Sequence, residues 1–225
     1  MHVIAHYNPP QEPYLDVLFE DAHLLVLNKP SGLLTVPGKS PDHRDCLESR
    51  ALEACPGARI IHRLDMETSG VIALAKDKKI QALISKQFER RQTEKSYIAR
   101  LFGHLDTDEG SIDLPLICDW PNRPKQMVDH TNGKPSLTHY RVLEREDAGG
   151  SKTPVTRVEF RPVTGRSHQL RVHALSIGHP ILGDNLYGSP ASKSAAKRLQ
   201  LHAKTLTLFH PALEKSMAFE APLPF

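Results

Sequence analysis

The sequence predicts an α+β fold, in which a mixed, mostly antiparallel central sheet is flanked by helices. Segments with strand patterns arrive in runs, and the few segments with helical spacing fall between them irregularly, unlike a regular strand–helix–strand winding. With 39% hydrophobic and 24% charged residues over 225 positions, the composition is that of an ordinary globular protein. We therefore expect a single domain over residues 1–225, with a short extended arm over about the first 14 residues.

The chain begins with this arm and a predicted β-hairpin. The prolines of "NPPQEP" exclude a helix or a central strand. Residues 15–20 and 23–28 are typical of two short strands, and Pro and Gly punctuate the "NKPSGLLTVPGK" that follows. Residues 42–55 carry Leu47, Ala51 and Ala54 at helical spacing, which predicts a helix that ends at the next Pro-Gly pair.

The next segments predict two strands joined by a charged loop, and then a helix. Residues 58–62 and 71–76 are the strands, with "RLDMETSG" between them. Asp77 is a suitable N-cap for the helix. The apolar residues that this helix is expected to bury are Ile80, Leu83, Ile84 and Phe88.

The rest of the chain is mostly strand. Strands are expected at 95–103, 136–144, 155–163, 201–211 and 215–222, and the third alternates most clearly between apolar and charged residues. Ser167 is expected to cap one more helix, which ends at the Gly178 and Pro180 pair.

Charge and cysteine content limit the classes of function. No stretch is apolar enough for a membrane span or a signal peptide, and the three cysteines lack the spacing of a disulfide framework or zinc knuckle, so a reducing cytoplasm is expected. The net charge of +3 does not by itself indicate nucleic acid, but residues 76–100 hold eight Lys or Arg against three acidic residues. Arg161, Arg166 and Arg171 form a second basic group. Such clusters suit a polyanion, although a solvated helix face explains them equally well.

Asp65 is the carboxylate that most invites a chemical interpretation. It lies two residues after Arg63, on a loop between two strands. A nearby guanidinium would keep it ionised, and a dry surround would increase its reactivity as a nucleophile or base. The structural alternative is that Asp65 caps its own turn by bonding to the backbone near Thr68 or Ser69, and spacing alone favours this alternative.

Two further residues have both a functional and a structural interpretation. Arg166, at the end of a loop, is suited to grip a phosphate or a carboxylate, or to form a rim salt bridge of little energetic consequence. Tyr97 is suited to stack on a base or to be an ordinary core aromatic.

No cofactor and no metal site are expected. The sequence has neither a glycine-rich phosphate loop nor a serine-hydrolase elbow. His168 and His173 are five residues apart, whereas a helical pair of ligands would be four apart. The histidines are therefore assigned to the surface or the core.

Several motifs together resemble one known family. "HRLDMETSG" is similar to the H-R-L-D-x-x-T-S-G signature of the RluA family of pseudouridine synthases, and "KSYIA" is similar to its K-x-Y-x-A segment. "TGRSHQLRVH" and "LQLHA" resemble the family's two later motifs, and the matches run in order from Val17 to Phe219. The resemblance implies the family's catalytic fold without a separate N-terminal RNA-binding module, and an isomerisation of uridine that uses neither metal nor cofactor.

The resemblance also implies roles for individual residues. Asp65 would be the essential catalytic aspartate, Tyr97 the ring that packs on the uracil, and Arg166 the ion-pair partner of Asp65. Arg63 would fill the space that the target base leaves in the RNA when it flips out. The remaining implied contacts to uracil or RNA are Leu201, Arg123 and Lys125.

Segments outside the catalytic motifs indicate the targets. "YNPPQEP", "NKPSGLLTVPG" and "LPLICDWPNRPKQ" are similar to the dual-specificity members of the family, which modify a 23S rRNA uridine and a uridine of the tRNA anticodon stem-loop. These RNAs are the expected partners of a monomeric enzyme. Three alternatives stay open: another rRNA or tRNA uridine, a non-catalytic RNA-binding protein, and a hydrolase in which Asp65 and Glu67 form an acid/base pair.

Overall fold

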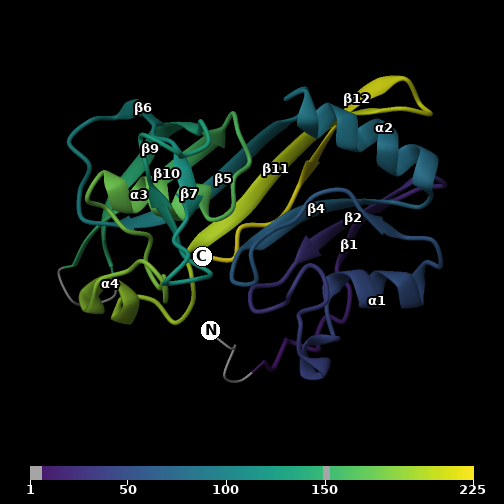
Figure 1. Cartoon of the computed structure of the whole chain (residues 1–225), viewed down its shortest axis with the longest axis horizontal. Helices are drawn as coiled ribbons and strands as arrows, with labels where there is room; N and C mark the ends of the chain where they lie inside the picture. Colours follow the sequence, from purple (N-terminus) through teal and green to yellow (C-terminus); the bar gives the residue numbers. More distant parts are fainter. Residues whose placement is uncertain (1–6, 149–152) are drawn as a thin grey trace. The chain divides into compact units, whose positions relative to one another are not determined.

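The computed structural model describes residues 7–148 and 153–225, which form two compact units (Figure 1). The terminal unit comprises residues 7–95 and 202–224, and the central unit comprises residues 96–201 with Phe225. The chain enters the central unit within strand β5 (Glu94–Phe102) and leaves it within strand β11 (Leu201–His210).

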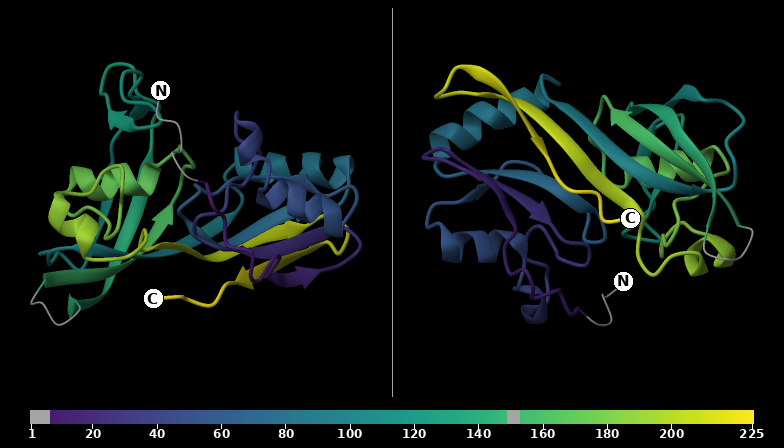
Figure 2. Two further views of the ribbon diagram at one scale, coloured as in Figure 1. Left: turned by 90° about the horizontal axis from the view of Figure 1, so that it is seen from below. Right: turned by 180° about the vertical axis from the view of Figure 1, so that it is seen from behind.

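The sheet of the terminal unit is mixed. Its elements are β1 (Val17–Glu20), β2 (Leu24–Lys29), α1 (Leu47–Ala54), β3 (Arg59–Ile60), β4 (Ser69–Ala75), α2 (Lys78–Glu89), β11 and β12 (Lys215–Glu220). The strand order is β1–β2–β4–β11, with β3 paired to β4 and β12 paired to β11. Only β4 and β11 are parallel among these pairs, and both helices lie on one face of the sheet (Figure 2). The predicted α+β class is confirmed.

Helix α2 forms where the sequence predicts it, but its buried face differs at one position. The Asp77 carboxylate caps the helix by accepting a hydrogen bond from the Ile80 N–H at 2.9 Å. Ile80 and Ile84 are buried as expected, whereas Leu83 is 40% exposed, so that prediction is wrong. The buried face is completed instead by Gln87, whose side chain bonds the backbone N–H and C=O of Phe209 on β11 at 2.9 and 2.8 Å.

Helix α1 begins later than predicted. The sequence favours a start at residue 42, but residues 41–43 form a single 3₁₀ turn and the helix starts at Leu47. Cys46 is the N-cap, and its backbone N–H donates to the Ser49 hydroxyl at 3.0 Å, while its thiol accepts from the Ser49 N–H at 3.4 Å. This reciprocal cap, with sulfur in place of the usual oxygen, fixes the start of the helix.

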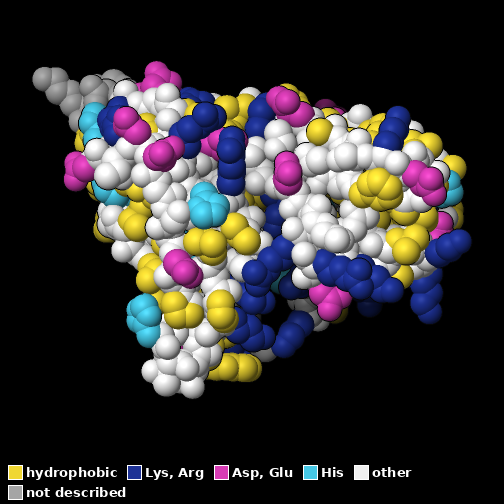
Figure 3. Space-filling model, turned by 90° about the horizontal axis from the view of Figure 1, so that it is seen from above, with side chains coloured by type: hydrophobic (Ala, Val, Ile, Leu, Met, Phe, Trp, Pro, Cys, Tyr) yellow, Lys and Arg dark blue, Asp and Glu magenta, His cyan; other side chains and the backbone are white. Residues whose placement is uncertain are grey.

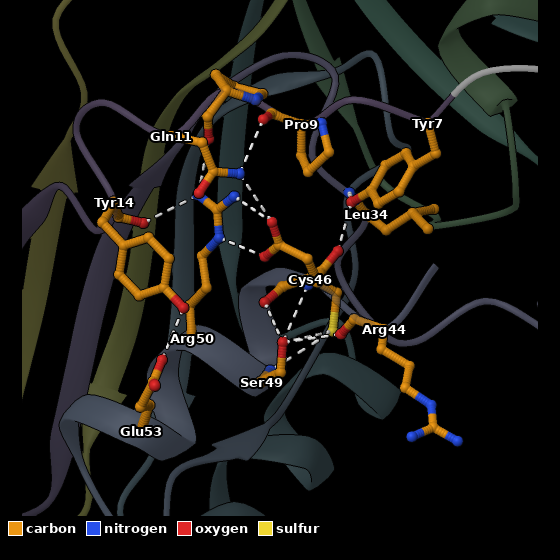
Figure 4. Close-up of polar contacts among 12 residues, drawn as sticks. Tyr7, Pro9, Gln11, Tyr14, Leu34, Arg44, Cys46, Ser49, Arg50 and Glu53 are labelled. Carbon is orange, nitrogen blue, oxygen red and sulfur yellow. Dashed lines mark hydrogen bonds and ion pairs between the residues drawn. The ribbon is translucent and has the colours of Figure 1, made fainter. Parts of the chain in front are cut away.

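Arg50 of α1 fixes the N-terminal arm (Figure 4). Its fully buried side chain bonds both carboxylate oxygens of Asp45, at 2.6 and 2.8 Å, and these bonds are the main cause of an Asp45 pKa below the ordinary value. Its Nη1 also donates to the carbonyl oxygens of Pro10 and Tyr14, at 2.8 and 3.1 Å. The predicted arm is therefore ordered without helix or strand from Tyr7 onward, and its first six residues lie outside the described residues.

The central unit is built on an antiparallel sheet of order β5–β10–β9–β6. Its further elements are β6 (Glu109–Asp113), β7 (Leu116–Cys118), β8 (Gln126–Val128), β9 (Leu137–Ala148), β10 (Thr153–Pro162), α3 (Gln169–Ser176) and α4 (Pro190–Ser194). Leu170 and Ala174 of α3 share one buried cluster with Val158 and Phe160 of β10. The predicted alternation along β10 is confirmed, because Val158 and Phe160 are fully buried and Arg161 is exposed.

A separate two-stranded hairpin, β7–β8, extends from the central unit (teal, left view of Figure 2). Its base packs on the rest of the unit through a small buried cluster of Leu116, Val172 and Tyr187. The sequence pattern does not predict these two strands, because each has only three residues and the prolines between them suggest an irregular loop.

Candidate active site

The loop that carries Asp65 joins β3 to β4 in the terminal unit. At its start, the His62 ring stacks on Phe88 of α2 with centroids 4.6 Å apart, and its Nε2 accepts a hydrogen bond from the Ala73 N–H at 3.1 Å. Burial lowers the His62 pKa to about 3, so the ring is neutral near pH 7 and can accept this bond. The start of the loop is therefore fixed to the strand that follows it.

Gly70 fixes the end of the loop. Its φ of +115° lies in a region that L side chains rarely adopt, and a Cβ at this position would overlap the backbone of Ala203 on β11. The preceding Ser69 hydroxyl bonds Nδ1 of His202, also on β11, at 2.9 Å. The Thr-Ser-Gly sequence thus allows β4 and β11 to approach closely directly after the Asp65 loop.

Thr35 holds the residue immediately before Asp65. Its hydroxyl donates to the Leu64 carbonyl oxygen at 2.7 Å and accepts from the Leu64 N–H at 3.3 Å. Thr35 is 3% exposed and Leu64 is 7% exposed, so water competes little for these bonds. The adjacent Leu34 N–H donates to the Tyr7 hydroxyl at 3.0 Å, which connects the same segment to the N-terminal arm.

Lys29 holds the residue immediately after Asp65. Its ammonium group is fully buried and donates to the carbonyl oxygens of Pro30, Leu33 and Met66, at 2.9, 2.6 and 2.9 Å. Several carbonyl dipoles around a buried cation offset part of its desolvation cost.

Asp65 lies half-buried between these two fixed residues, and Arg63 is exposed two positions before it. The turn after Asp65 is closed by its backbone carbonyl, which accepts from the Thr68 N–H at 3.1 Å. The Ser31 hydroxyl donates to the Glu67 carbonyl oxygen at 2.7 Å. Backbone bonds on both sides of Asp65 restrict its position, which is what a catalytic carboxylate requires.

Arg166 lies in the central unit, on the loop between β10 and α3. Its exposed side chain makes a long bond from Nε to the Pro135 carbonyl oxygen, at 3.4 Å, whereas its backbone N–H donates to Oε1 of Gln169 at 3.0 Å. Gln169 is 4% exposed, and its Nε2 donates to the Leu137 carbonyl oxygen and the Thr138 hydroxyl, at 3.1 and 2.9 Å. A buried carboxamide therefore fixes the Arg166 backbone to β9.

The predicted cap of α3 is wrong. Helix α3 begins at Gln169, and its N-cap is His168, which has a left-handed φ of 54° and makes no side-chain capping bond. The Gln169 carboxamide, at the first position of the helix, instead accepts a hydrogen bond from the Arg166 N–H in the preceding loop. His168 is fixed through Nδ1, which lies 2.7 Å from the Tyr187 hydroxyl.

Tyr97 and Leu201 belong to the same core of the central unit. Leu201 is 3% exposed within the main buried cluster, and the half-buried Tyr97 packs against that cluster. Tyr97 lies opposite Phe160 in the pairing of β5 with β10.

Arg123 and Lys125 lie together at the tip of the β7–β8 hairpin. Arg123 is exposed and its guanidinium carbon lies 4.3 Å from the centroid of the Trp120 ring, whereas Lys125 is half-buried. The structure thus groups the predicted residues as Arg63 with Asp65 on one loop, Tyr97 with Leu201 in one core, and Arg123 with Lys125 on one hairpin.

Over residues 7–148 and 153–225, no group of three His, Cys, Asp or Glu side chains is placed to hold a metal ion. Among the same residues, no helix is long and apolar enough to cross a membrane.

Comparison with known protein families, relatives and solved structures identifies the family of this chain. A family model described as RNA pseudouridylate synthase matches residues 23–176, a span that includes Asp65, Tyr97 and Arg166. The chain belongs to the RNA pseudouridylate synthase family. The resemblance to its RluA branch is confirmed by a curated relative from Escherichia coli K12, the dual-specificity RNA pseudouridine synthase RluA, which is 51% identical over 99% of both chains.

Other members of the pseudouridylate synthase family agree with this assignment. A relative of the same description from Vibrio parahaemolyticus is 52% identical over 91% of this chain and 82% of its own length. The solved structure of human RNA pseudouridylate synthase domain containing 1 superposes with a TM-score of 0.81, at 30% identity over 97% of this chain and 87% of that one. The pseudouridine synthase fold expected from the motifs is thereby confirmed.

The sequence patterns do not predict the buried polar residues that hold the Asp65 loop and the Arg166 loop. Lys29 and Thr35 lie in a segment with two prolines and two glycines, which suggests an exposed loop, and both are buried. Gln169 lies next to apolar Leu170 within "SHQLRV", and a polar residue at the start of a buried helix face was the one available signal.

Proposed function

We propose that this pseudouridylate synthase converts a uridine of 23S rRNA and a uridine of the tRNA anticodon stem-loop to pseudouridine. Relatives named dual-specificity RNA pseudouridine synthase support these targets, because they share about half of their residues with this chain over 99% of both lengths. The structural observation that carries the proposal is the fixed position of Asp65, whose two chain neighbours are bonded to the buried side chains of Thr35 and Lys29.

The proposed reaction is balanced without a co-reactant. The bond between uracil N1 and ribose C1′ breaks, the ring turns, and C5 joins C1′. A proton leaves C5 and N1 gains a proton, so that the product is an isomer. Asp65 supplies the carboxylate on which cleavage and rejoining depend, Tyr97 packs on the uracil, and Arg166 pairs with the Asp65 carboxylate. Motif positions support the last two roles.

Access to the uridine requires base flipping. A stacked base cannot turn, and extruding it costs a few kcal/mol, least in a loop where it is unpaired. Arg63, exposed two positions before Asp65, is proposed to occupy the space that the base leaves. Leu201, in the same core as Tyr97, is proposed to line the uracil pocket, and Arg123 and Lys125 are proposed to contact RNA.

We also propose that both units together form one catalytic domain, which acts as a monomer in the cytoplasm without metal or cofactor. The match over nearly the full length of the relatives supports one functional domain, and three free cysteines suit a reducing compartment. Sedimentation at working concentration and turnover after exhaustive chelation test the monomer and the absence of a metal.

The experiment that tests the function maps pseudouridines in total rRNA and tRNA from a strain of the source organism that lacks this gene. We expect one 23S rRNA site and one tRNA anticodon-loop site to be lost and then restored by the wild-type gene, but not by Asp65→Ala. If pseudouridines were lost only at other sites, the proposed target uridines would be refuted, whereas the proposed isomerisation would stand. RNA binding without any lost pseudouridine would favour a non-catalytic protein, and free uracil or shortened RNA would favour a hydrolase.

A further inference from the structure

Trp120 is the most exposed large hydrophobic side chain of the described residues. It is the only tryptophan in the sequence and is 62% exposed, at the tip of the β7–β8 hairpin. Arg123 lies over its ring, with the guanidinium carbon 4.3 Å from the ring centroid. The hairpin stands away from the rest of the central unit in the left view of Figure 2 and at the lower left of Figure 3, where hydrophobic side chains (yellow) are exposed along it.

The tip is ordered by its own hydrogen bonds. The Arg123 Nε donates to the Trp120 carbonyl oxygen at 3.0 Å, which holds the guanidinium beside the ring. The Asp119 N–H donates to the Lys125 carbonyl oxygen at 3.0 Å and closes the loop. The Asp119 carboxylate accepts from the Asn122 side chain at 2.9 Å, and so its charge is directed into the loop. A surface that is already ordered loses little conformational entropy when it binds a partner.

The hairpin is also bonded to the rest of the central unit, at the end next to its tip loop and at its base. The Gln126 N–H at the start of β8 donates to the Tyr187 hydroxyl at 2.8 Å, and Val128 packs against the cluster that contains Tyr187 and Leu116. Tyr187 bonds His168 in turn, directly before α3. The loop that carries the exposed indole is therefore anchored to the central unit through β8 and Tyr187.

The chemistry of the tip fits a nucleobase better than an apolar protein pocket. An aromatic ring with a guanidinium on one face offers a flat, partly cationic surface, and unpaired RNA bases stack on such surfaces. Arg123 and Lys125 supply the positive charge that the neighbouring phosphates require, and Asp119, the acidic residue of the tip loop, is bonded to Asn122. An apolar protein partner would have to desolvate both cations without neutralising them.

We propose that Trp120, with Arg123 stacked on it, forms a platform that receives an unpaired base of the RNA substrate other than the uridine that is isomerised. This inference rests on the proposed function, because it takes structured RNA as the substrate. The platform positions the RNA and takes no part in bond making or breaking.

The single tryptophan makes the test direct, because all indole emission reports on Trp120. The wild-type protein is titrated with a tRNA anticodon stem-loop, while indole fluorescence and the anisotropy of a label on the RNA are followed together. We expect fluorescence quenching that saturates with the anisotropy change. Trp120→Ala should weaken RNA binding by about 5- to 150-fold, and Trp120→Phe should weaken it less, because it keeps an aromatic face.

Two further variants separate stacking from charge and from general surface effects. Phe209→Ala removes an aromatic side chain of similar exposure, 47%, from the terminal unit and should leave binding unchanged. Arg123→Ala should weaken binding and also reduce the slope of log affinity against log salt, whereas Trp120→Ala should leave that slope as it is. Circular dichroism of each variant confirms that it is folded.

The outcomes distinguish this inference from the proposed function. The platform would be overturned if the wild-type protein bound and converted RNA with no change in indole fluorescence and if Trp120→Ala kept wild-type affinity. Trp120 would then be assigned to contact with a protein partner. RNA that is neither bound nor converted by the wild-type protein would refute the proposed function itself. If Trp120→Ala did not fold, the titration of the wild-type protein would still decide the question.

Discussion

Thr35→Val tests whether buried side chains fix the Asp65 loop. Valine has nearly the same shape as threonine and replaces the hydroxyl with a methyl group. The hydroxyl is the group that bonds both the N–H and the carbonyl oxygen of Leu64, at 3.3 and 2.7 Å. Because Leu64 and Thr35 are both buried, neither backbone group can turn to water after the substitution. The change therefore isolates the contact without opening a cavity.

The expected effect follows from two buried backbone groups that lose their partner. A buried polar group without a hydrogen bond costs about 1–3 kcal/mol. The carbonyl bond is short and should lie in the upper part of this range, whereas the 3.3 Å bond from the Leu64 N–H should lie near the lower limit. We expect the free energy of unfolding to fall by about 2–4 kcal/mol. A displacement of Asp65 by about 1 Å would also lower kcat by about 100-fold, with KM little changed.

Urea denaturation followed by far-UV circular dichroism measures the stability, and release of tritium from RNA labelled at uracil C5 measures turnover. Thr35→Ser is the matched control, because it keeps the hydroxyl and loses only the methyl group. It should retain most of the stability and most of kcat. Wild-type stability and wild-type kcat in Thr35→Val would refute the reasoning, as would equal losses in the Val and Ser variants.

Three further predictions concern stability. Gly70→Ala should lower the free energy of unfolding, measured by urea denaturation, by more than about 2 kcal/mol, because of the positive φ and the overlap with Ala203. Gly178 also has a positive φ, +85°, but open space around it, so Gly178→Ala should lower this free energy less. Equal losses in the two variants would contradict the overlap. Since the His62 pKa is lowered to about 3, the unfolded chain takes up a proton first as pH falls below about 6.5, and stability at pH 5 should be about 2 kcal/mol lower than at pH 7. His62→Gln should reduce this pH dependence, and an unchanged dependence would show that other groups cause it. Gln169→Glu places a carboxylate against the Leu137 carbonyl oxygen and should lower the melting temperature and the unfolding free energy, by about 2–4 kcal/mol; a loss below about 1 kcal/mol would exclude the bonding role assigned to this carboxamide.

The sequence predicts those parts of the fold that depend on residues close together in the chain. The alternation of Val158 and Phe160 with charged residues requires one buried face, and β10 has that face. Asp77 was identifiable as a cap because its side chain needs only the N–H three residues ahead. The glycine at the end of the Asp65 motif also has a local cause, because the positive φ of Gly70 requires a residue without a side chain.

Contacts between distant segments were not predictable in this way. The start of α1 depends on a cap made by Cys46, a residue with low capping propensity. The burial of Gln87 in α2 depends on hydrogen bonds to the backbone of Phe209, 122 residues away. The burial of Lys29 depends on the Met66 carbonyl oxygen, 37 residues later in the chain. Such bonds carry no periodic signal, and they are the ones that hold the candidate site.

The Asp65 carboxylate is proposed to be required for isomerisation, and its replacement tests this requirement directly. Asp65→Asn keeps the size of the side chain and removes its charge, and Glu67→Gln makes the same change two positions later. Both are assayed with RNA that carries tritium at uracil C5, together with RNA binding. We expect Asp65→Asn to bind RNA and release no tritium above background, while Glu67→Gln stays close to wild type. Substantial tritium release by Asp65→Asn would contradict the account.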